Sequence, residues 1–228
     1  VVRELDIIVD WSVSIEPYAD ARTSSQEIFE QAKEMSRWTD KAWIKFPTTL
    51  EGLKATRQAI KKGIRANMTL CFSQEQAAAV YASTQSKTRS DLVAERREKI
   101  FVSPFVGRLD DRGENGMQLI ENILKMYQGS DGHVWVLTAS VRNINHLFYA
   151  LQLKSPIITV PFKIFRDWAD RGFPIPDKSY QYHPQGLKPI PYKKILLDKP
   201  WSEYNLHHEL TDIGIDKFSA DWNAIVKG

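Results

Sequence analysis

The sequence predicts an α/β fold built on a parallel β-sheet, and three observations carry this prediction. Short β-branched or apolar runs alternate with helical patterns along the chain. Several helix starts carry capping signals, in which a hydroxyl and a later Glu or Gln satisfy free backbone amides. Polar residues gather where the strand-like runs end, which is where parallel sheets and barrels place their chemistry.

Strand-like runs and helical patterns follow one another in strict alternation. The predicted strands cover 12–16, 42–46, 64–70, 100–104, 133–139 and 157–160. The predicted helices cover 24–38, 49–62, 74–86, 115–128, 143–153 and 162–171. Strands that are each followed by a helix are typical of a parallel sheet with helical crossovers.

Capping boxes define the starts of the first three of these helices. The predicted pairs are Ser24 with Glu27, Thr48 with Glu51, and Ser73 with Gln76. Residues 1–10 also form a helical pattern, with Leu5, Ile8 and Val9 on one face. Because this helix leads into the strand at 12–16, we expect its acidic residues at the end of the sheet opposite the polar strand ends.

Composition describes an ordinary globular chain. Its 228 residues are 43% hydrophobic and 26% charged, which fits one domain or at most two. A net charge of +3 argues against nucleic-acid and membrane partners but leaves anionic small molecules open. Cys71 is the single cysteine, and neither a membrane span nor a secretory signal is present in the sequence. The cytoplasm is therefore the expected location.

Lys45 is the candidate nucleophile. It stands alone in the apolar run Ala42-Trp43-Ile44-Lys45-Phe46-Pro47, directly before a helix start. A lysine held among apolar side chains loses hydration, which favours the neutral amine that forms Schiff bases. The run itself leaves open the alternative that the stem packs in the core while the ammonium reaches water.

Polar side chains close the neighbouring strands as well. Successive strands that each deliver polar groups to a common rim meet the requirement of a barrel active site. Each of these residues also has a simpler interpretation when it is taken alone. Glu16 fits a solvated loop, Asn67 and Thr69 fit backbone capping, and Ser103 and Ser140 fit turns. The candidates are Glu16, Lys45, Asn67, Thr69, Ser103, Arg108, Ser140 and Arg142.

The two arginines indicate an anion site. Arg108 and Arg142 each follow a strand, and a guanidinium can direct two donors onto one phosphate. The alternative for each is a solvated surface arginine. Together with an amine nucleophile, the pair predicts a phosphorylated carbonyl substrate.

Six segments carry motifs of a known family. They read VSIE (13–16), IKFPTTLEGLKA (44–55), NMTLCFSQEQA (67–77), VSPFVGRLD (102–110), ASVRN (139–143) and LTDIGIDKFSADW (210–222). In order and spacing they resemble the transaldolases of the class I, Schiff-base-forming aldolase superfamily. The resemblance extends from about residue 12 to the C-terminus.

The resemblance implies a TIM (β/α)8 barrel that works without a cofactor or a metal. It implies a transferase of the pentose phosphate pathway that moves a dihydroxyacetone unit from sedoheptulose 7-phosphate or fructose 6-phosphate to glyceraldehyde 3-phosphate or erythrose 4-phosphate. Lys45 matches the residue that attacks the ketose carbonyl. Glu16 and Thr69 match the pair that positions a catalytic water for proton transfer.

The remaining rim residues match substrate contacts of the family. Asn67 matches the residue that orients the substrate hydroxyls or the imine, and Ser103 lines the pocket. Arg108 and Arg142, together with Ser140, resemble the phosphate site.

Two positions bear on the related fructose-6-phosphate aldolases, which remain the alternative enzyme. Those lyases carry an amide residue where Glu16 stands and a tyrosine where Phe105 stands. The tyrosine hydroxyl favours release to water. Glu16 with Phe105 therefore favours transfer.

The first part of the family's sequence pattern has no counterpart in this chain. Six strands supply about six of the eight βα units, and the strand with the family's acid/base aspartate finds no match. We expect about 50 to 70 further N-terminal residues in the natural polypeptide, since two units of a barrel are absent. A catalytically impaired phosphosugar-binding protein therefore stays open as the non-enzymatic alternative.

The sequence predicts two parts, a barrel at 1–172 and a C-terminal extension at 173–228. The extension is proline-rich up to 205 and ends in a helix near 211–225; it either wraps the barrel or contacts a neighbouring subunit of a homo-oligomer. The stretch 87–99 mixes both charge signs, as a solvated helix or loop does. The carboxylates at 108–114 form a loop without calcium-site spacing, so no metal is expected.

Overall fold

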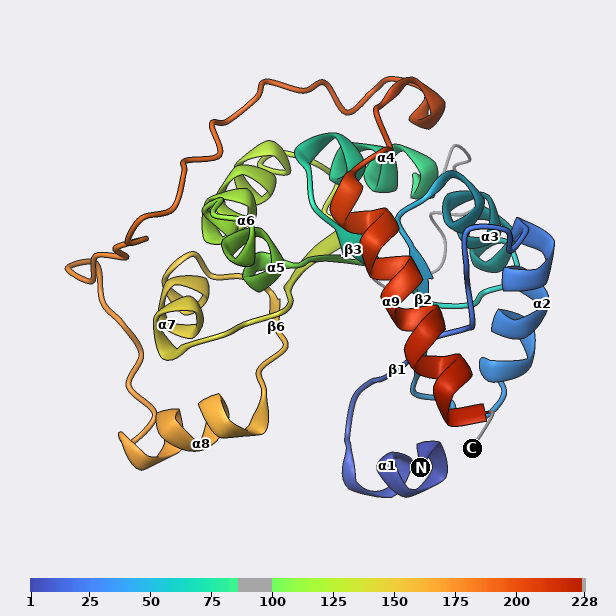
Figure 1. Ribbon diagram of the computed structural model, residues 1–228, viewed down its shortest axis with the longest axis horizontal. Helices are drawn as coiled ribbons and strands as arrows, with labels where there is room; N and C mark the ends of the chain where they lie inside the picture. Colours follow the sequence, from blue (N-terminus) through green and yellow to red (C-terminus); the bar gives the residue numbers. More distant parts are fainter. Residues whose placement is uncertain (86–99, 227–228) are drawn as a thin grey trace.

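A computed structural model describes residues 1–85 and 100–226. Its sheet confirms the α/β prediction: six strands follow one another in sequence order, and every neighbouring pair is parallel. The sheet curls into part of a barrel (Figure 1). The strands are β1 (Val13–Ile15), β2 (Ala42–Pro47), β3 (Ala66–Cys71), β4 (Ile100–Pro104), β5 (Val134–Thr138) and β6 (Ile157–Ile158). The charged stretch 87–99 lies outside the described residues.

All six predicted crossover helices are confirmed. They are α2 (Ser25–Met35), α3 (Leu50–Ile60), α4 (Gln74–Thr84), α6 (Gly116–Met126), α7 (Ile144–Gln152) and α8 (Phe162–Asp170). The helix expected at the N-terminus is α1 (Val2–Ile8), and the C-terminal one is α9 (Glu209–Val226). The interpretation of 108–114 as a loop was wrong in its first half, because Val106–Asp111 forms α5.

The helix starts follow the capping signals with one shift. The Ser24–Glu27 capping box of α2 is confirmed. At α3 the prediction was off by one residue: Thr49 is the N-cap, while the Thr48 hydroxyl donates to the Thr69 carbonyl (2.7 Å). Ser73 caps α4 as expected, but the capping box is not complete, because Gln76 Oε1 accepts from the Phe72 amide (2.7 Å) instead of the Ser73 amide.

The core lies between the outer face of the sheet and the helices. Its largest buried side chains include Ile44, Phe46 and Met68 from the strands and Leu53 and Ile120 from the helices. Burial of side chains of this size from water is the main term that holds helices to a sheet.

The inner face of the sheet carries an aromatic cluster below the strand ends. Trp43 and Phe101 stack with ring centroids 5.2 Å apart. Trp11 comes from the segment before β1, and its ring centroid lies 5.7 Å from that of Phe101 and 6.2 Å from that of Trp135. These rings form the apolar floor on which the polar layer nearer the carboxyl ends rests.

Helix α1 lies at the amino end of the sheet. Asp6 accepts a hydrogen bond from the Thr39 hydroxyl, and Lys41, just before β2, donates to the Asp6 carbonyl (2.6 Å). Asp6 therefore lies at the end opposite the polar strand ends, as the sequence predicted. None of the α1 residues is buried.

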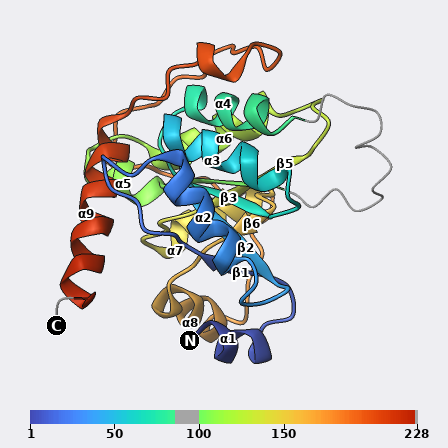
Figure 2. The same cartoon turned by 90° about the vertical axis from the view of Figure 1, so that its right-hand side faces the viewer.

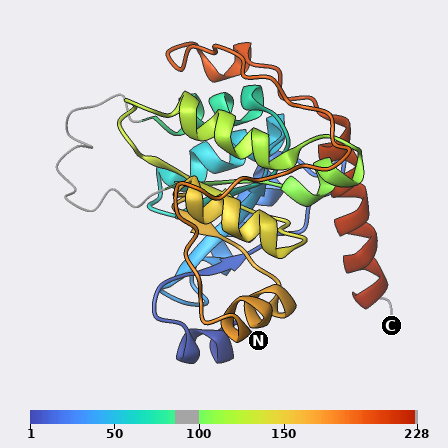
Figure 3. The same ribbon diagram turned by 90° about the vertical axis from the view of Figure 1, so that its left-hand side faces the viewer.

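The segment after α8 runs along the outside of the helices before it returns to the sheet (Figures 1 and 3). Its only regular element is the 3-10 helix η2 (Trp201–Glu203). Side chains of α4 and α6 hold it: Asn122 donates to the Ile190 carbonyl (2.7 Å), and Gln74 accepts from the Lys193 amide (2.8 Å). Neither α9 nor any other described helix combines the length and apolarity that crossing a bilayer requires.

Helix α9 passes the carboxyl end of the sheet, as Figure 2 shows from the side. The Thr211 hydroxyl donates to the Leu70 carbonyl (3.0 Å) and accepts from Gln76 Nε2 (2.8 Å). At Gly214 a Cβ atom would come within 2.6 Å of Leu70 Cδ2, so a larger residue would require the Leu70 side chain to shift. The first half of α9 is thus fixed to β3.

Candidate active site

The predicted rim residues come from neighbouring strands at one end of the sheet. Lys45 lies beside Asn67 in the register of β2 and β3, and Pro47 lies beside Thr69. Ser103 belongs to β4. Because side chains alternate between the two faces of a strand, Lys45 shares the inner face with Trp43, two residues before it.

Lys45 forms an ion pair with Glu16, which follows β1. The Lys45 side chain is 23% exposed and the Glu16 side chain is 33% exposed. Most of the lysine side chain is therefore shielded from water, and its head meets a carboxylate. A carboxylate in direct contact with an amine is well placed to exchange a proton with it.

Asn67 bridges the inner face at the same level. Its Nδ2 donates to Ser14 Oγ (3.1 Å), and its Oδ1 accepts from Ser103 Oγ (2.6 Å). Asn67 and Ser103 are both buried. This network fixes the orientation of the amide group, since each of its two ends has a different partner.

Thr69 differs from its neighbours. It is fully buried, and its hydroxyl has no hydrogen-bond partner among the described residues. A buried hydroxyl without a partner costs about 1 to 3 kcal/mol, so it is the expected site for a bound water or substrate hydroxyl.

The two arginines arise from adjacent segments. Arg108 lies on α5, and the chain beside it packs closely on the turn after β5: the Gly107 amide donates to the Ser140 carbonyl (3.0 Å). A Cβ at Gly107 would come within 2.4 Å of Arg142 Cγ. Ser140 itself has φ +60°, an uncommon conformation for a residue other than glycine.

The two guanidinium groups have different partners. Arg142 Nη2 donates to Asp111 Oδ2 (2.8 Å), and both side chains are more than half exposed. The Arg108 guanidinium carbon lies 5.4 Å from the centre of the Phe218 ring.

A buried histidine joins the arginine-bearing segments. His146 Nδ1 accepts the backbone N–H of Arg142 (3.3 Å), and His146 Nε2 lies 2.7 Å from Asp110 Oδ2. Asp110 Oδ1 also accepts from the Gly116 amide (2.9 Å). A single proton on Nε2 satisfies both ring contacts. His146 therefore fixes α5 and the turn after β5 relative to each other.

Phe105 and Cys71 complete the rim. Phe105 precedes α5 and meets Phe72 edge-on, with ring centroids 5.8 Å apart. Cys71 is fully buried, and this burial raises the pKa of its thiol to about 12. A protonated thiol is a poor nucleophile, so Lys45 has no competitor there.

A pocket of about 330 Å³ opens between the rim and α9. Glu16 and Tyr18 line it from the segment after β1, and Phe218 and Trp222 line it from α9. A wider depression of about 540 Å³ lies over α2, but its carboxylates, among them Glu27 and Glu30, would repel a phosphate.

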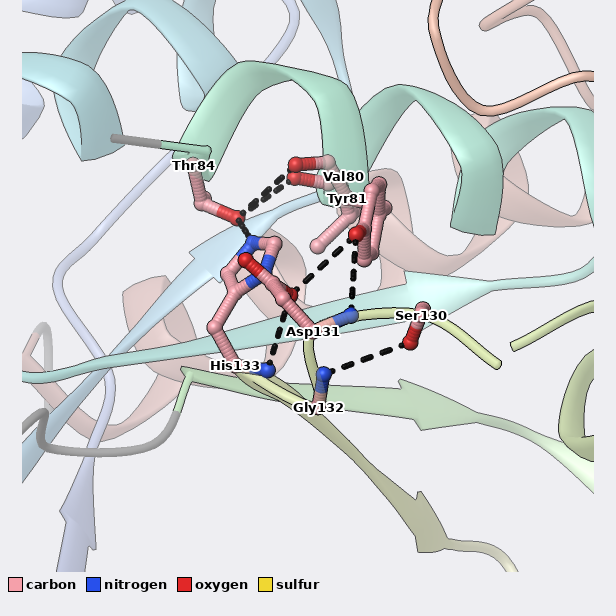
Figure 4. A network of polar contacts seen from close by, with 7 residues as sticks. All are labelled: Val80, Tyr81, Thr84, Ser130, Asp131, Gly132 and His133. Atoms are coloured by element: carbon pink, nitrogen blue, oxygen red, sulfur yellow. Dashed lines mark hydrogen bonds and ion pairs between the residues drawn. The ribbon is translucent and has the colours of Figure 1, made fainter. Parts of the chain in front are cut away.

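A second polar network lies at the amino end of the sheet (Figure 4). Asp131 contacts His133 Nδ1, and His133 Nε2 lies 3.0 Å from Thr84 Oγ1. This order of groups resembles a hydrolytic triad. Thr84 is the last residue of α4, however, and its hydroxyl donates to the Val80 carbonyl (2.8 Å), as helix-end hydroxyls often do.

Three residues of the rim were not singled out from the sequence. Ser14 could have been found, since it lies two positions before Glu16 and so on the same face of β1. His146 lies four residues after Arg142 in the sequence, which is a weaker signal. Phe218 carries no local signal, because only the course of α9 brings it to the rim.

The whole chain, residues 1–228, matches the family described as Transaldolase/Fructose-6-phosphate aldolase. Individual relatives agree with this match. A probable transaldolase of Roseiflexus castenholzii is 30% identical over 227 residues, which cover 100% of this chain and 80% of the relative.

Two further relatives carry the same description. A probable transaldolase of Myxococcus xanthus is 31% identical over 227 residues, 99% of this chain and 78% of the relative. One of Brucella ovis is 33% identical over 222 residues, 97% of this chain and 77% of the relative.

Proposed function

Since this chain belongs to the transaldolase/fructose-6-phosphate aldolase family, we propose that it transfers a dihydroxyacetone unit between sugar phosphates through a Schiff base on Lys45. The donor would be fructose 6-phosphate or sedoheptulose 7-phosphate, and the acceptor an aldose phosphate. The proposal includes a role in the cytoplasmic pentose phosphate pathway.

The ion pair between Lys45 and Glu16 is the observation that best supports this proposal. A Schiff base requires a neutral amine, and proton exchange with an adjacent carboxylate supplies it. The Thr69 hydroxyl, which has no hydrogen-bond partner within 1–85 and 100–226, lies on the strand next to that of Lys45 and suits the water that carries protons during imine formation.

The proposed chemistry has two stages. Lys45 Nζ attacks the C2 carbonyl, water leaves, and the resulting imine accepts the electrons of the C3–C4 bond as that bond breaks. The C4 hydroxyl loses its proton, an aldose phosphate departs, and an enamine remains on Lys45. The enamine carbon then attacks the carbonyl carbon of the acceptor, and hydrolysis of the new imine frees the ketose.

The other rim residues receive binding roles. The Asn67 amide group, which its hydrogen bonds to Ser14 and Ser103 orient, would bind the substrate hydroxyls, and Ser103 would line the pocket beside it. Arg108, Arg142 and Ser140 would hold the phosphate, because guanidinium groups bind phosphate oxygens through paired donors. Phe105, which lacks a hydroxyl, favours transfer over release to water.

Borohydride trapping tests the nucleophile. The chain is incubated with fructose 6-phosphate, reduced, digested and analysed by mass spectrometry; we expect the reduced adduct on Lys45 alone. Lys45→Met should abolish the adduct, whereas Lys54→Met, a change on the exposed side of α3, should leave it intact. A wild-type chain without an adduct at Lys45 would refute the Schiff base and leave the phosphosugar-binding alternative.

Product analysis separates the two enzymes of the family. With erythrose 4-phosphate as acceptor, a transaldolase forms sedoheptulose 7-phosphate. Without an acceptor, an aldolase releases glyceraldehyde 3-phosphate and dihydroxyacetone at a comparable rate. We expect transfer to exceed release; the reverse result would assign the chain to the aldolases.

A further inference from the structure

The inward face of α9 forms an apolar stripe over the rim. Gly214, Ile215, Phe218, Trp222 and Ile225 recur at three- and four-residue spacing, which places them on one side of the helix. The stripe is buried at Gly214 and Ile215 and half-buried at Phe218. Figure 1 shows α9 crossing β1, which ends just before Glu16, and β2, which carries Lys45.

Phe218 lies against two of the proposed site's cations. The centre of its ring is 6.0 Å from Lys45 Nζ and 5.4 Å from the Arg108 guanidinium carbon. Contacts at these distances draw a cation toward the ring and also keep water from that side of it. Phe218 further lines the pocket that contains Glu16.

The position of Phe218 is fixed by the preceding turns of α9. Thr211 is bound to the Leu70 carbonyl and to Gln76, and Gly214 packs on the Leu70 side chain. Leu70 has φ +58°, so the backbone of β3 takes an uncommon conformation at the point where it receives the helix. The ring of Phe218 is therefore held in a fixed position next to the Lys45 amine, where it can limit access of water.

We propose that Phe218 is a specificity-determining residue that shields the Lys45 intermediate from water and so favours transfer to an aldehyde over release of dihydroxyacetone. This inference rests on the proposed function and adds a residue from α9 to it. The same ring would hold Arg108 toward the phosphate side of the pocket.

The two fates of the enamine explain why a cover matters. In transfer, the enamine carbon forms a bond to the aldehyde carbon, and the aldehyde oxygen takes a proton. In release, the enamine carbon instead takes a proton derived from water, and a second water hydrolyses the imine to dihydroxyacetone and free Lys45. Both steps of release need water at the covered amine, whereas bond formation in transfer needs none.

The ratio of release to transfer measures the proposed effect. Release is glyceraldehyde 3-phosphate formed from fructose 6-phosphate alone, and transfer is sedoheptulose 7-phosphate formed with erythrose 4-phosphate. We expect Phe218→Ala to raise the ratio about tenfold, equivalent to about 1.4 kcal/mol between the two barriers. Phe218→Leu, which keeps an apolar side chain but loses the ring, should raise it less.

Ile213→Ala is the matched control. Ile213 belongs to the same helix, is 48% exposed and lies outside the apolar stripe. It should leave the ratio unchanged, and thermal unfolding should show that all three variants are folded. A ratio for folded Phe218→Ala within twofold of the wild type would overturn the inference.

A second readout does not depend on turnover. The chain is treated with an uncharged amine-reactive reagent, and mass spectrometry compares the labelling rate of Lys45 with the labelling rate of the exposed Lys61 in the same sample. Phe218→Ala should accelerate labelling of Lys45 several-fold relative to Lys61, and Ile213→Ala should not. If borohydride traps no substrate adduct on Lys45 of the wild type, the proposed function fails, but the labelling rates still show whether Phe218 covers Lys45. An unchanged labelling rate of Lys45 in Phe218→Ala would overturn the inference that the ring covers it.

Discussion

The two ends of the sheet carry polar networks of opposite character. At the amino end, the groups of Asp131, His133 and Thr84 satisfy one another and the end of α4. At the carboxyl end, the Thr69 hydroxyl is buried without a partner among the described residues. Completed buried networks stabilise a fold, whereas groups left unsatisfied indicate a place where a ligand binds.

Two uncommon backbone conformations and a pair of cations also occur at the carboxyl end. Leu70 and Ser140 adopt positive φ at the carboxyl ends of β3 and after β5. Lys45 and Arg108 share one aromatic ring there. Strained backbone and gathered cations cost stability, and folds tolerate them mainly where they serve binding or catalysis. Side-chain type alone would therefore mislead, since the triad-like group lies at the stabilising end.

Removing the carboxylate of Glu16 should have the largest effect. Glu16→Gln keeps the shape of the side chain but removes its capacity to exchange a proton, so kcat should fall by about 10²- to 10⁴-fold with little change in thermal stability. Glu30→Gln, at an exposed carboxylate of α2, is the control. Steady-state kinetics beside thermal unfolding measure both quantities; nearly full activity in Glu16→Gln would assign the rim a different proton carrier.

Loss of His146 should weaken phosphate binding rather than the chemical step. His146→Leu removes both contacts that tie the Arg142 turn to α5. We expect KM for fructose 6-phosphate to rise about tenfold while kcat changes little, as for an interaction made equally in the ground and transition states.

A substrate without phosphate separates positioning from general damage. Dihydroxyacetone as donor with glyceraldehyde as acceptor should be used equally by wild type and His146→Leu, since neither molecule carries a phosphate. His146→Gln, which can restore one of the two contacts, should recover part of the lost affinity. Equal losses for phosphorylated and unphosphorylated donors would show that His146 serves stability alone.

How much the sequence predicted also differs between the parts of the molecule. The alternation of strands and helices was predicted correctly because the elements carry their own periodicity and most of the crossover helices begin with a side-chain cap. Lys45, Asn67 and Ser103 could be predicted as neighbours because strand ends of a parallel sheet share one edge. The short helix α5 was missed, since its six residues are too few for a periodic pattern.

Contacts made by distant segments could not be predicted. Glu16 was among the predicted rim residues, but its ion pair with Lys45 could not be predicted, because the contact depends on the curl of the sheet. Phe218 reaches the rim only because Gly214 and Thr211 dock α9 on Leu70. The spacing of apolar residues on α9 indicates that one side of the helix is covered, but it does not indicate which strand covers it.

At the amino end, Asp131→Asn should change stability and leave activity alone. Burial acts to raise the pKa of Asp131, but hydrogen bonds from the side chain and backbone of His133 lower it below its ordinary value. A lowered pKa in the folded state stabilises the fold above the unfolded pKa of about 3.9, and this contribution is lost as pH falls through the folded value.

Urea unfolding at several pH values measures this effect. At pH 7, Asp131→Asn should cost about 1 kcal/mol of unfolding free energy, the size of a typical hydrogen bond. The difference from the wild type should shrink as pH falls below about 4, and it should vanish only below the lowered pKa of the folded carboxylate, where the wild-type Asp131 is protonated as well. A reduced kcat with unchanged stability would contradict the contrast between the two ends.

The smallest expected effect concerns Asp111, which forms an exposed ion pair with Arg142 and, under the proposed function, competes with substrate phosphate for it. Exposed pairs contribute about 0.2 to 1 kcal/mol, so Asp111→Asn should lower KM for fructose 6-phosphate by about two- to threefold. Because salt screens exposed charges, the gain should disappear near 1 M salt. KM measured against ionic strength for wild type and variant tests this; a higher KM in Asp111→Asn would mean that Asp111 orients Arg142 for phosphate instead of competing with it.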